Sequence, residues 1–222
     1  MSAHSAVVFV PHPDDEAYAF AGTMAALTEA DWRVRVVCLT RGEGGVDRRG
    51  PNADLAATRV SELKASCAIV GAQVEVLDLP DGRVSESDLD LTPWARDASI
   101  VLTLGDDGVY GHPDHLACTR LVGAATFEAP LLHAAFPRGH FAPVHRALSR
   151  FMPLERSAEQ LGTTREHVFH VADVRRYRAL KRASIGAHRS QLRDGEARSF
   201  LRRGLIDGLL DEEWFVLAGR AG

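Results

Sequence analysis

Val7-Val8-Phe9-Val10-Pro11-His12-Pro13-Asp14-Asp15-Glu16 is the stretch on which the fold and its site depend. Its apolar, partly β-branched start predicts a buried strand. The strand must stop at the two prolines, which cannot donate to a sheet ladder. It therefore delivers His12, Asp14, Asp15 and Glu16 to its carboxyl end, where open α/β sheets bind their ligands.

One imidazole and three carboxylates would repel one another within so short a stretch unless a cation or strong hydrogen-bond donors were present. A divalent metal ion is the simplest explanation. The alternative is that the acids begin a helix, where they complement the helix dipole, and that His12 is an ordinary loop histidine. The stretch by itself favours the metal site and leaves the helix start open.

The composition describes an ordinary globular chain. Its 222 residues, 45% of them hydrophobic, suffice for one α/β domain spanning residues 1–222. A net charge of −4 argues against a nucleic-acid partner, which would require clustered cations. No targeting segment or membrane span is expected, because no apolar run is long enough.

The chain has three cysteines, Cys38, Cys67 and Cys118. They are odd in number, lie in apolar surroundings and lack the C-x-x-C spacing of thiolate zinc sites. This pattern predicts buried free thiols, as in a reducing cytosol, so we expect a soluble cytoplasmic protein.

Apolar runs and helical repeats alternate along the first 130 residues. The pattern predicts strands at 7–10, 34–39, 74–79 and 99–104, and helices at 17–30, 54–70, 87–96 and 116–127. Repeated strand–helix–strand units favour a single-domain, Rossmann-like α/β fold, a three-layer sandwich with a mostly parallel sheet.

The rest of the chain is less regular. The pattern predicts a strand at 131–135, an antiparallel edge strand at 168–171 and a last strand or apolar docking segment at 213–217. Asp173 is expected to cap a basic helix ending near residue 187, with its charges facing solvent. His140, His145 and His167 lack partner spacing and are interpreted as surface residues.

Two other loops end at the same sheet edge as His12. The glycine-rich loop 40–45 follows the second strand and lacks G-x-G-x-x-G spacing, so it does not predict dinucleotide binding. It is either a flexible turn or backbone kept small for a substrate. Asp81, in the turn 80–82, is either a turn former or a substrate contact.

The loop after the fourth strand, 105–115, ends in Gly-His112-Pro-Asp114-His115. Two imidazoles and a carboxylate therefore reach the edge where His12 lies. Because three protein ligands and an open position are how catalytic zinc is held, the two clusters together favour a metal site over coincidence.

These motifs are specific to one known family. The stretches 11–16 and 111–115 resemble the LmbE-like (PIG-L) family of N-acetylglucosaminyl deacetylases. Further resemblances follow in family order: Thr40-Arg41-Gly42-Glu43-Gly44, Arg59 with Glu62-Leu63, Asp81-Gly82, Lys181 with His188-Arg189-Ser190-Gln191, and Glu213 with Phe215. They cover nearly the whole chain except residues 137–164.

The resemblance implies a zinc-dependent hydrolase that removes the acetyl group from an N-acetylglucosamine-containing small molecule, giving a free amine and acetate. Zn²⁺, or another divalent metal such as Fe²⁺, would be held by His12, Asp15 and His115. Asp14 would be the general base. The expected substrate is an N-acetylated amino sugar or its glycoside, and the oligomeric state stays open.

The resemblance also implies supporting roles. Tyr110 and a protonated His112 would donate to the oxyanion. Arg59 and Asp81 would contact sugar hydroxyls. Asp114 would orient His112 or a ligand histidine from behind, and Glu16 would support the ligands in the same way. Whether Asp14 or His112 protonates the leaving amine stays open.

Two readings from other classes compete with the enzyme. A receiver-type signalling module also carries paired acids after its first strand, but neither Lys64 nor Lys181 can take the place of its lysine, and the histidines near residue 112 would be unexplained. A non-catalytic sugar-binding relative is disfavoured because it would not need Asp14.

Overall fold

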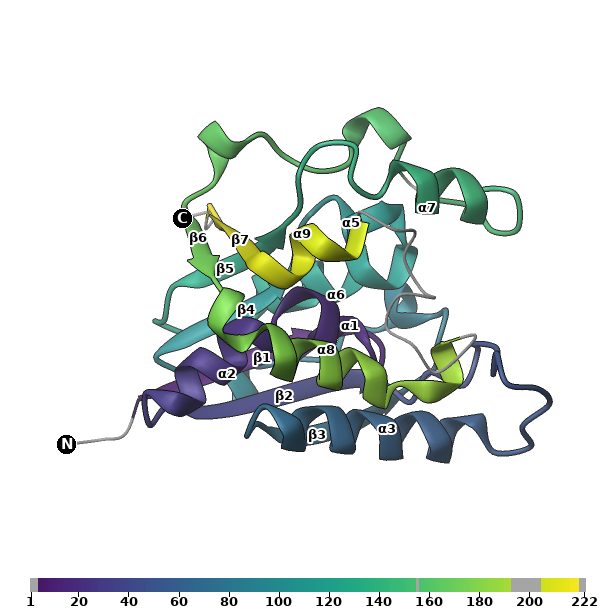
Figure 1. Cartoon of the computed structure of the whole chain (residues 1–222), viewed down its shortest axis with the longest axis horizontal. Helices are drawn as coiled ribbons and strands as arrows, with labels where there is room; N and C mark the ends of the chain where they lie inside the picture. Colours follow the sequence, from purple (N-terminus) through teal and green to yellow (C-terminus); the bar gives the residue numbers. More distant parts are fainter. Residues whose placement is uncertain (1–3, 155, 193–204, 220–222) are drawn as a thin grey trace.

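The computed structural model describes residues 4–154, 156–192 and 205–219. Over these residues seven strands form one sheet in the order β3-β2-β1-β4-β5-β7-β6 (Figure 1). β1 to β5 run parallel, β7 is antiparallel to β5, and β6 is antiparallel to β7. The strands are β1 Ser5–Val10, β2 Arg33–Thr40, β3 Gln73–Leu79, β4 Ile100–Leu104, β5 Leu131–Ala135, β6 His170–Asp173 and β7 Glu212–Leu217.

Helices cover both faces of the sheet. The α-helices are α1 Asp15–Ala19, α2 Ala21–Glu29, α3 Leu55–Ile69, α4 Thr92–Ala95, α5 Gly108–Gly111, α6 Pro113–Ala124, α7 Ala142–Leu148, α8 Arg178–Ala187 and α9 Leu205–Asp211. Short 3-10 turns are η1 Val84–Glu86, η2 Ala158–Gln160, η3 Arg165–His167, η4 Arg175–Tyr177 and η5 Arg189–Gln191. None of the helices in the described part of the chain is long and apolar enough to cross a bilayer.

Successive residues of β1 point into two separate cores. Val8 and Val10 pack in the core beneath α1, α2, α3 and α8, whereas Val7 and Phe9 pack in the core beneath α4 and α6. Figure 1 shows α8 lying beside α2 and α3. A parallel sheet buried on both faces requires strands that are apolar on both sides, which is why β1 reads as an uninterrupted apolar run. The predicted α/β three-layer fold is confirmed.

The helix expected at 17–30 is broken in two at Phe20, whose φ of −135° is not helical. The break gives α2 its own amino terminus, where the amides of Gly22 and Thr23 donate to the carboxylate of Glu213, at 2.9 and 2.7 Å. The cap comes from β7, 190 residues away in the chain. A continuous helix was therefore the wrong prediction, because no local signal shows this cap.

Other boundaries also differ from the expectation. The helix expected at 87–96 is reduced to the four residues of α4, and the 3-10 turn η1 lies just before that range. α6 begins at Pro113 rather than 116, because His112 caps it and proline suits a first helical turn. Asp173 ends β6, and its carboxylate accepts from the amide of Arg175 in η4, so it does not cap α8.

Two predictions of solvent exposure were wrong. His145 is 9% exposed, and its Nε2 lies 2.7 Å from the carbonyl oxygen of Arg156. His140 is half-buried against Phe136 and Phe141. No motif in the sequence indicates either contact. His167 is exposed, as predicted.

The basic helix α8 does not direct all its charges to solvent. Lys181 is 0% exposed and donates to Glu213, which is 4% exposed. Burial lowers the pKa of Lys181, while the adjacent Glu213 carboxylate raises it. The ammonium group thus compensates a buried carboxylate that also caps α2, which joins α8, β7 and α2 at one point.

We expect Lys181→Met to lower the free energy of unfolding by about 3–5 kcal/mol, because it leaves Glu213 buried without its cation. Chemical unfolding followed by circular dichroism measures this. Arg176→Met, which removes an exposed ion pair with Glu29, is the matched control and should change stability much less. A Lys181→Met variant as stable as the wild type would contradict the role assigned to this pair.

Candidate metal centre and active site

The site lies where the order of the strands reverses. β1 stands beside β4, and the chain leaves β1 through α1 and α2 on one face but leaves β4 through α6 on the other. Such a switch point opens a crevice at the carboxyl ends of the two strands. The loops that follow β1 and β4 carry the two ligand clusters predicted from sequence, and the structure brings them together.

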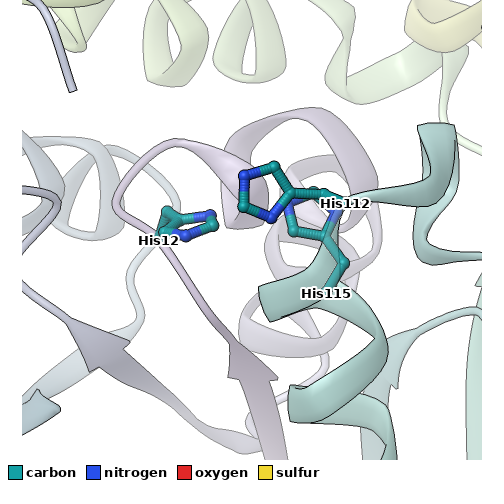
Figure 2. Close-up of side chains that lie close together, drawn as sticks. All are labelled: His12, His112 and His115. Carbon is teal, nitrogen blue, oxygen red and sulfur yellow. The ribbon is translucent and has the colours of Figure 1, made fainter. Parts of the chain in front are cut away.

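Three histidine rings converge in this crevice (Figure 2). The ring centroids of His12 lie 4.9 Å from His112 and 5.3 Å from His115, and those of His112 and His115 are 4.9 Å apart. One nitrogen from each ring lies within 4.8 Å of the others, which is close enough for a shared ion.

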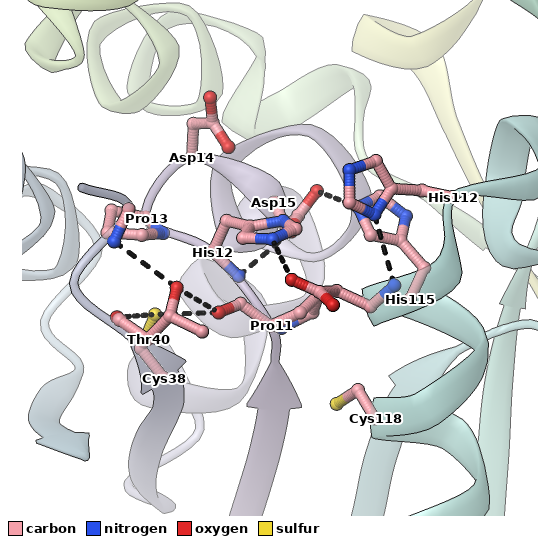
Figure 3. A network of polar contacts seen from close by, with 12 residues as sticks. Pro11, His12, Pro13, Asp14, Asp15, Cys38, Thr40, His112, His115 and Cys118 are labelled. Atoms are coloured by element: carbon pink, nitrogen blue, oxygen red, sulfur yellow. Dashed lines mark hydrogen bonds and ion pairs between the residues drawn. The ribbon is translucent and has the colours of Figure 1, made fainter. Parts of the chain in front are cut away.

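Asp15 lies between two of these rings (Figure 3). Its Oδ2 is 3.4 Å from Nδ1 of His12, and its Oδ1 is 3.5 Å from Nε2 of His115. Two ligands of one tetrahedral zinc ion, bonded at about 2.0–2.1 Å, are about 3.3 Å apart. Asp15 therefore lies at ligand spacing from each of the two histidines, through a different carboxylate oxygen for each.

The hydrogen bonding of His115 supports the same reading. Its Nε2 is buried and has no hydrogen-bond partner among the described residues. Burial lowers the pKa of His115 to about 4, which keeps a lone pair on the ring. A buried nitrogen without a partner is costly, and a metal ion would provide the missing partner. The residues present therefore fit a divalent metal.

Asp114 orients His12. Nε2 of His12 lies 3.1 Å from Oδ2 of Asp114, which is 0% exposed and also accepts from the amides of Gly82 and Val84, at 2.7 and 3.1 Å. Although burial raises it, the hydrogen bond from His12 holds the pKa of Asp114 below its usual range. A carboxylate on Nε2 orients the ring and turns its Nδ1 toward Asp15.

Asp81 joins the same arrangement from the turn after β3. Its Oδ1 is 3.1 Å from Nε2 of His12, and its Oδ2 accepts from the amide of Gly44 at 2.9 Å. A Cβ on Gly44 would stand 3.2 Å from that carboxylate oxygen. At Gly44 the glycine-rich loop therefore leaves room for a neighbouring side chain, a reason different from the flexible turn and the substrate access expected from sequence.

Asp14 stands apart from the ligand cluster, as Figure 3 shows. Its Oδ2 is 3.3 Å from Nη2 of Arg59, whose guanidinium also donates to the carbonyls of Gly42 and Pro13, at 2.9 and 2.6 Å. Burial raises the pKa of Asp14 to about 6, and Arg59 opposes this shift. Asp15 differs: burial raises its pKa too, but His115 and His12 bring it below the usual range.

His112 and Tyr110 occupy a strained loop. Nδ1 of His112 accepts from the amide of Asp114 at 3.1 Å, and burial lowers the ring's pKa to about 3. This arrangement favours a neutral ring with its proton on Nε2 over the protonated ring expected from sequence. Just before it, β-branched Val109 has a φ of +66°, which strained functional loops tolerate.

One cavity of about 430 Å³ collects these side chains. Seven of the ten predicted site residues line it: His12, Asp14, Asp15, Arg59, Asp81, Tyr110 and His112. The other three, Glu16, Asp114 and His115, are 0% exposed. Much of the apolar wall comes from Phe136, Phe141, Leu148 and Met152. The last three lie in or beside α7, within the region 137–164 that matched no family motif.

The sequence did not lead us to one residue that lies near the site, His188. His188 is 0% exposed, and its Nε2 lies 2.7 Å from Oε1 of Glu16, beside the loop that carries Asp14. The stretch 188–191 matched a family motif but was interpreted as the end of a helix. A histidine in a motif, at the junction of two helical turns, was the signal that could have located it.

Fold and cluster together define an α/β protein with a candidate metal centre at the switch point of its sheet. Residues 7–126 match the family model described as PIG-L: GlcNAc-PI de-N-acetylase. Because that match covers more than half of the 222 residues, the chain belongs to the PIG-L family.

Two relatives carry enzyme names. A 1D-myo-inositol 2-acetamido-2-deoxy-alpha-D-glucopyranoside deacetylase from Acidothermus cellulolyticus is 32% identical over 174 residues, covering 62% of this chain and 60% of that protein. A probable N-acetyl-alpha-D-glucosaminyl L-malate deacetylase 2 from Bacillus cereus is 33% identical over 153 residues, covering 60% of this chain and 68% of that protein. The chain thus spans less than two thirds of the first relative's length.

Solved structures show the same fold in different enzymes. An N,N'-diacetylchitobiose deacetylase from Pyrococcus horikoshii superposes with a TM-score of 0.67 at 22% identity, covering 98% of this chain and 84% of that one. The 4-carboxy-2-hydroxymuconate hydratase GalB from Pseudomonas putida KT2440 superposes with a TM-score of 0.62 at 18% identity, covering 97% and 96%. At these identities the likeness concerns the fold alone.

Proposed function

We propose that this protein is a metal-dependent N-deacetylase that hydrolyses the acetamide of an N-acetylglucosamine-containing small molecule, giving a free amine and acetate. The observation that carries the proposal is the spacing of His12, Asp15 and His115, with the Asp14 carboxylate in the same cavity. Both relatives described above are named as deacetylases of glucosaminyl compounds.

We assign His12, Asp15 and His115 as the metal ligands. Two imidazoles and a carboxylate form a donor set that suits Zn²⁺ and also Fe²⁺, and zinc is our first choice. When bound, the metal would acidify a water molecule and polarise the acetamide carbonyl. Asp114 orients the ring of the His12 ligand.

Asp14 takes the role of general base. It is adjacent to a ligand but is not spaced as one, and it lines the cavity into which the substrate must enter. Arg59 holds its carboxylate from the other side at 3.3 Å. A carboxylate so placed accepts the proton of the attacking water, and either it or His112 returns a proton to the leaving amine.

The remaining residues bind and orient the substrate. Nε2–H of His112, and Tyr110 beside it, are the donors available to the oxyanion. Arg59 and Asp81 line the cavity and are assigned to sugar hydroxyls, in addition to their contacts within the protein. The three cysteines are free and buried, and on this ground we place the enzyme in the reducing cytosol.

Release of amine from N-acetylglucosamine and its glycosides, with the metal chelated and then restored, tests the function. We expect turnover that a chelator abolishes and that Zn²⁺ or Fe²⁺ restores. Hydration of an unsaturated acid, with no amine release from any acetamido sugar, would instead align the protein with the hydratase that shares its fold.

We expect His12→Ala, Asp15→Ala and His115→Ala each to lower both zinc content and turnover, because each removes one of three ligands. Metal analysis of the purified variants, beside an amine-release assay, measures the two losses. His133→Ala, on β5 outside the cluster, is the control and should keep both. Full zinc with normal turnover in any ligand variant would remove that residue from the set.

Asp14→Asn should retain zinc, because the three ligands remain, but should lose about 10²–10⁴-fold in turnover, the usual worth of a positioned general base. Asp15→Asn, a matched change one residue away, should lose metal affinity first. Zinc titration and kcat for the two variants decide between the roles. An Asp14→Asn variant without zinc, or with near-normal turnover, would contradict them.

A further inference from the structure

The backbone at Asp14 is strained. Its φ of +122° and ψ of −28° lie in a region that residues with a Cβ rarely adopt. Such a conformation costs free energy and persists only where the surroundings over-determine it. The proposed base therefore has backbone dihedral angles that an aspartate does not favour, so neighbouring groups must hold it there.

The first restraint is a hydrogen bond to the side chain of Glu16, two residues further along the chain. The amide of Asp14 donates to Oε2 of Glu16 at 3.0 Å. The Asp14 carbonyl meanwhile accepts from Ala17 and Tyr18 at the start of α1, at 3.1 and 3.4 Å. The peptide on one side of Asp14 is thus fixed by α1, and the peptide on the other side is fixed by the Glu16 carboxylate.

Glu16 is in turn held by groups from far along the chain. It is 0% exposed, and its Oε1 accepts from the hydroxyl of Ser66 on α3 at 2.5 Å and from Nε2 of His188 at 2.7 Å. Ser66 also lies 2.7 Å from the hydroxyl of Ser184 on α8, and all four side chains are 0% exposed. The carboxylate is therefore oriented by Ser66 on α3 and by His188 at the end of α8.

We propose that Glu16 and His188 are positioning residues that impose the strained conformation on Asp14 and so aim its carboxylate into the cavity. The proposal rests on the base role given to Asp14 above. Their hydrogen bonds run to Asp14, to Ser66 and to each other, and none of those described for His188 reaches His12, Asp15 or His115. The network is expected to act on the base and to leave the metal in place.

A matched pair at position 188 separates positioning from mere packing. His188→Gln keeps a donor at the distance of Nε2, whereas His188→Met has similar length and no donor. We expect His188→Met to lower kcat by about 10–100-fold, as loss of an orienting partner usually does, with zinc content and KM little changed. His188→Gln should keep most of the wild-type kcat.

Cys67→Ala is the packing control, because it removes a buried sulfur beside Ser66 and no hydrogen bond described for the network. Its kcat should match that of the wild type. A His188→Met variant with wild-type kcat would overturn the proposal, and so would equal losses in the Gln and Met variants. Zinc loss from His188→Met would assign the network to the metal instead.

A second experiment needs no activity and therefore survives failure of the proposed function. Glycine adopts positive φ without penalty, so Asp14→Gly relieves the strain, whereas Asp14→Ala removes the same carboxylate and keeps the strain. Asp14→Gly should melt about 2–10 °C above Asp14→Ala.

The same comparison in the His188→Met background closes a double-mutant cycle. If His188 and Glu16 impose the strain, weakening them lets the alanine backbone relax, and the advantage of glycine over alanine should shrink by at least half. A gap that is absent from the start, or that stays unchanged when His188 is replaced, would refute the proposal even in a protein with no deacetylase activity.

Discussion

Two adjacent aspartates with different partners are the constraint on which this site depends. Asp15 lies against His12 and His115, while Asp14, one residue earlier, contacts Arg59. Between the two side chains the backbone leaves the strand and enters α1 through the unusual φ of +122° at Asp14. Much of the surrounding structure serves it: Arg59 holds the Pro13 carbonyl, Glu16 holds the Asp14 amide, and α1 starts immediately after.

Buried carboxylates are the second theme, and each is matched by donors from a distant element. Glu16 accepts hydrogen bonds from Ser66 and His188. Asp114 accepts them from His12 and two backbone amides. Glu213 accepts them from Lys181 and the amino terminus of α2. An unpaired charge in such places would be costly, so these contacts cannot be lost singly without consequence. They tie the carboxyl edge of the sheet to α2, α3 and α8.

The features of the fold and site that could be predicted are those set by residues close together in the sequence. Apolar runs located the strands, and the side chains directly after β1 and β4 had to meet because parallel strands end at one edge. The break at Phe20, the burial of Lys181 and the enclosure of His145 were missed, because each depends on a partner distant in the chain: Glu213, or the Arg156 carbonyl. The backbone strain at Asp14 could not be predicted either, because no residue type in the sequence indicates it.

The fold alone does not choose the reaction, because a hydratase and a deacetylase both share it. What differs between such enzymes must lie in the donor set at the sheet edge and in the wall opposite it. Here the donors stand in the loop after β1 and in the first turns of α1 and α6, fixed by buried hydrogen bonds, whereas much of the wall comes from residues 136–152, whose Leu148 and Met152 are only half-buried. The buried, hydrogen-bonded donors therefore suit the chemistry, which tolerates little displacement, and the more exposed wall suits recognition of whatever group the proposed substrate carries. A change of substrate within this family would accordingly be expected to fall on the wall, and to leave Asp14 and the groups that hold it untouched.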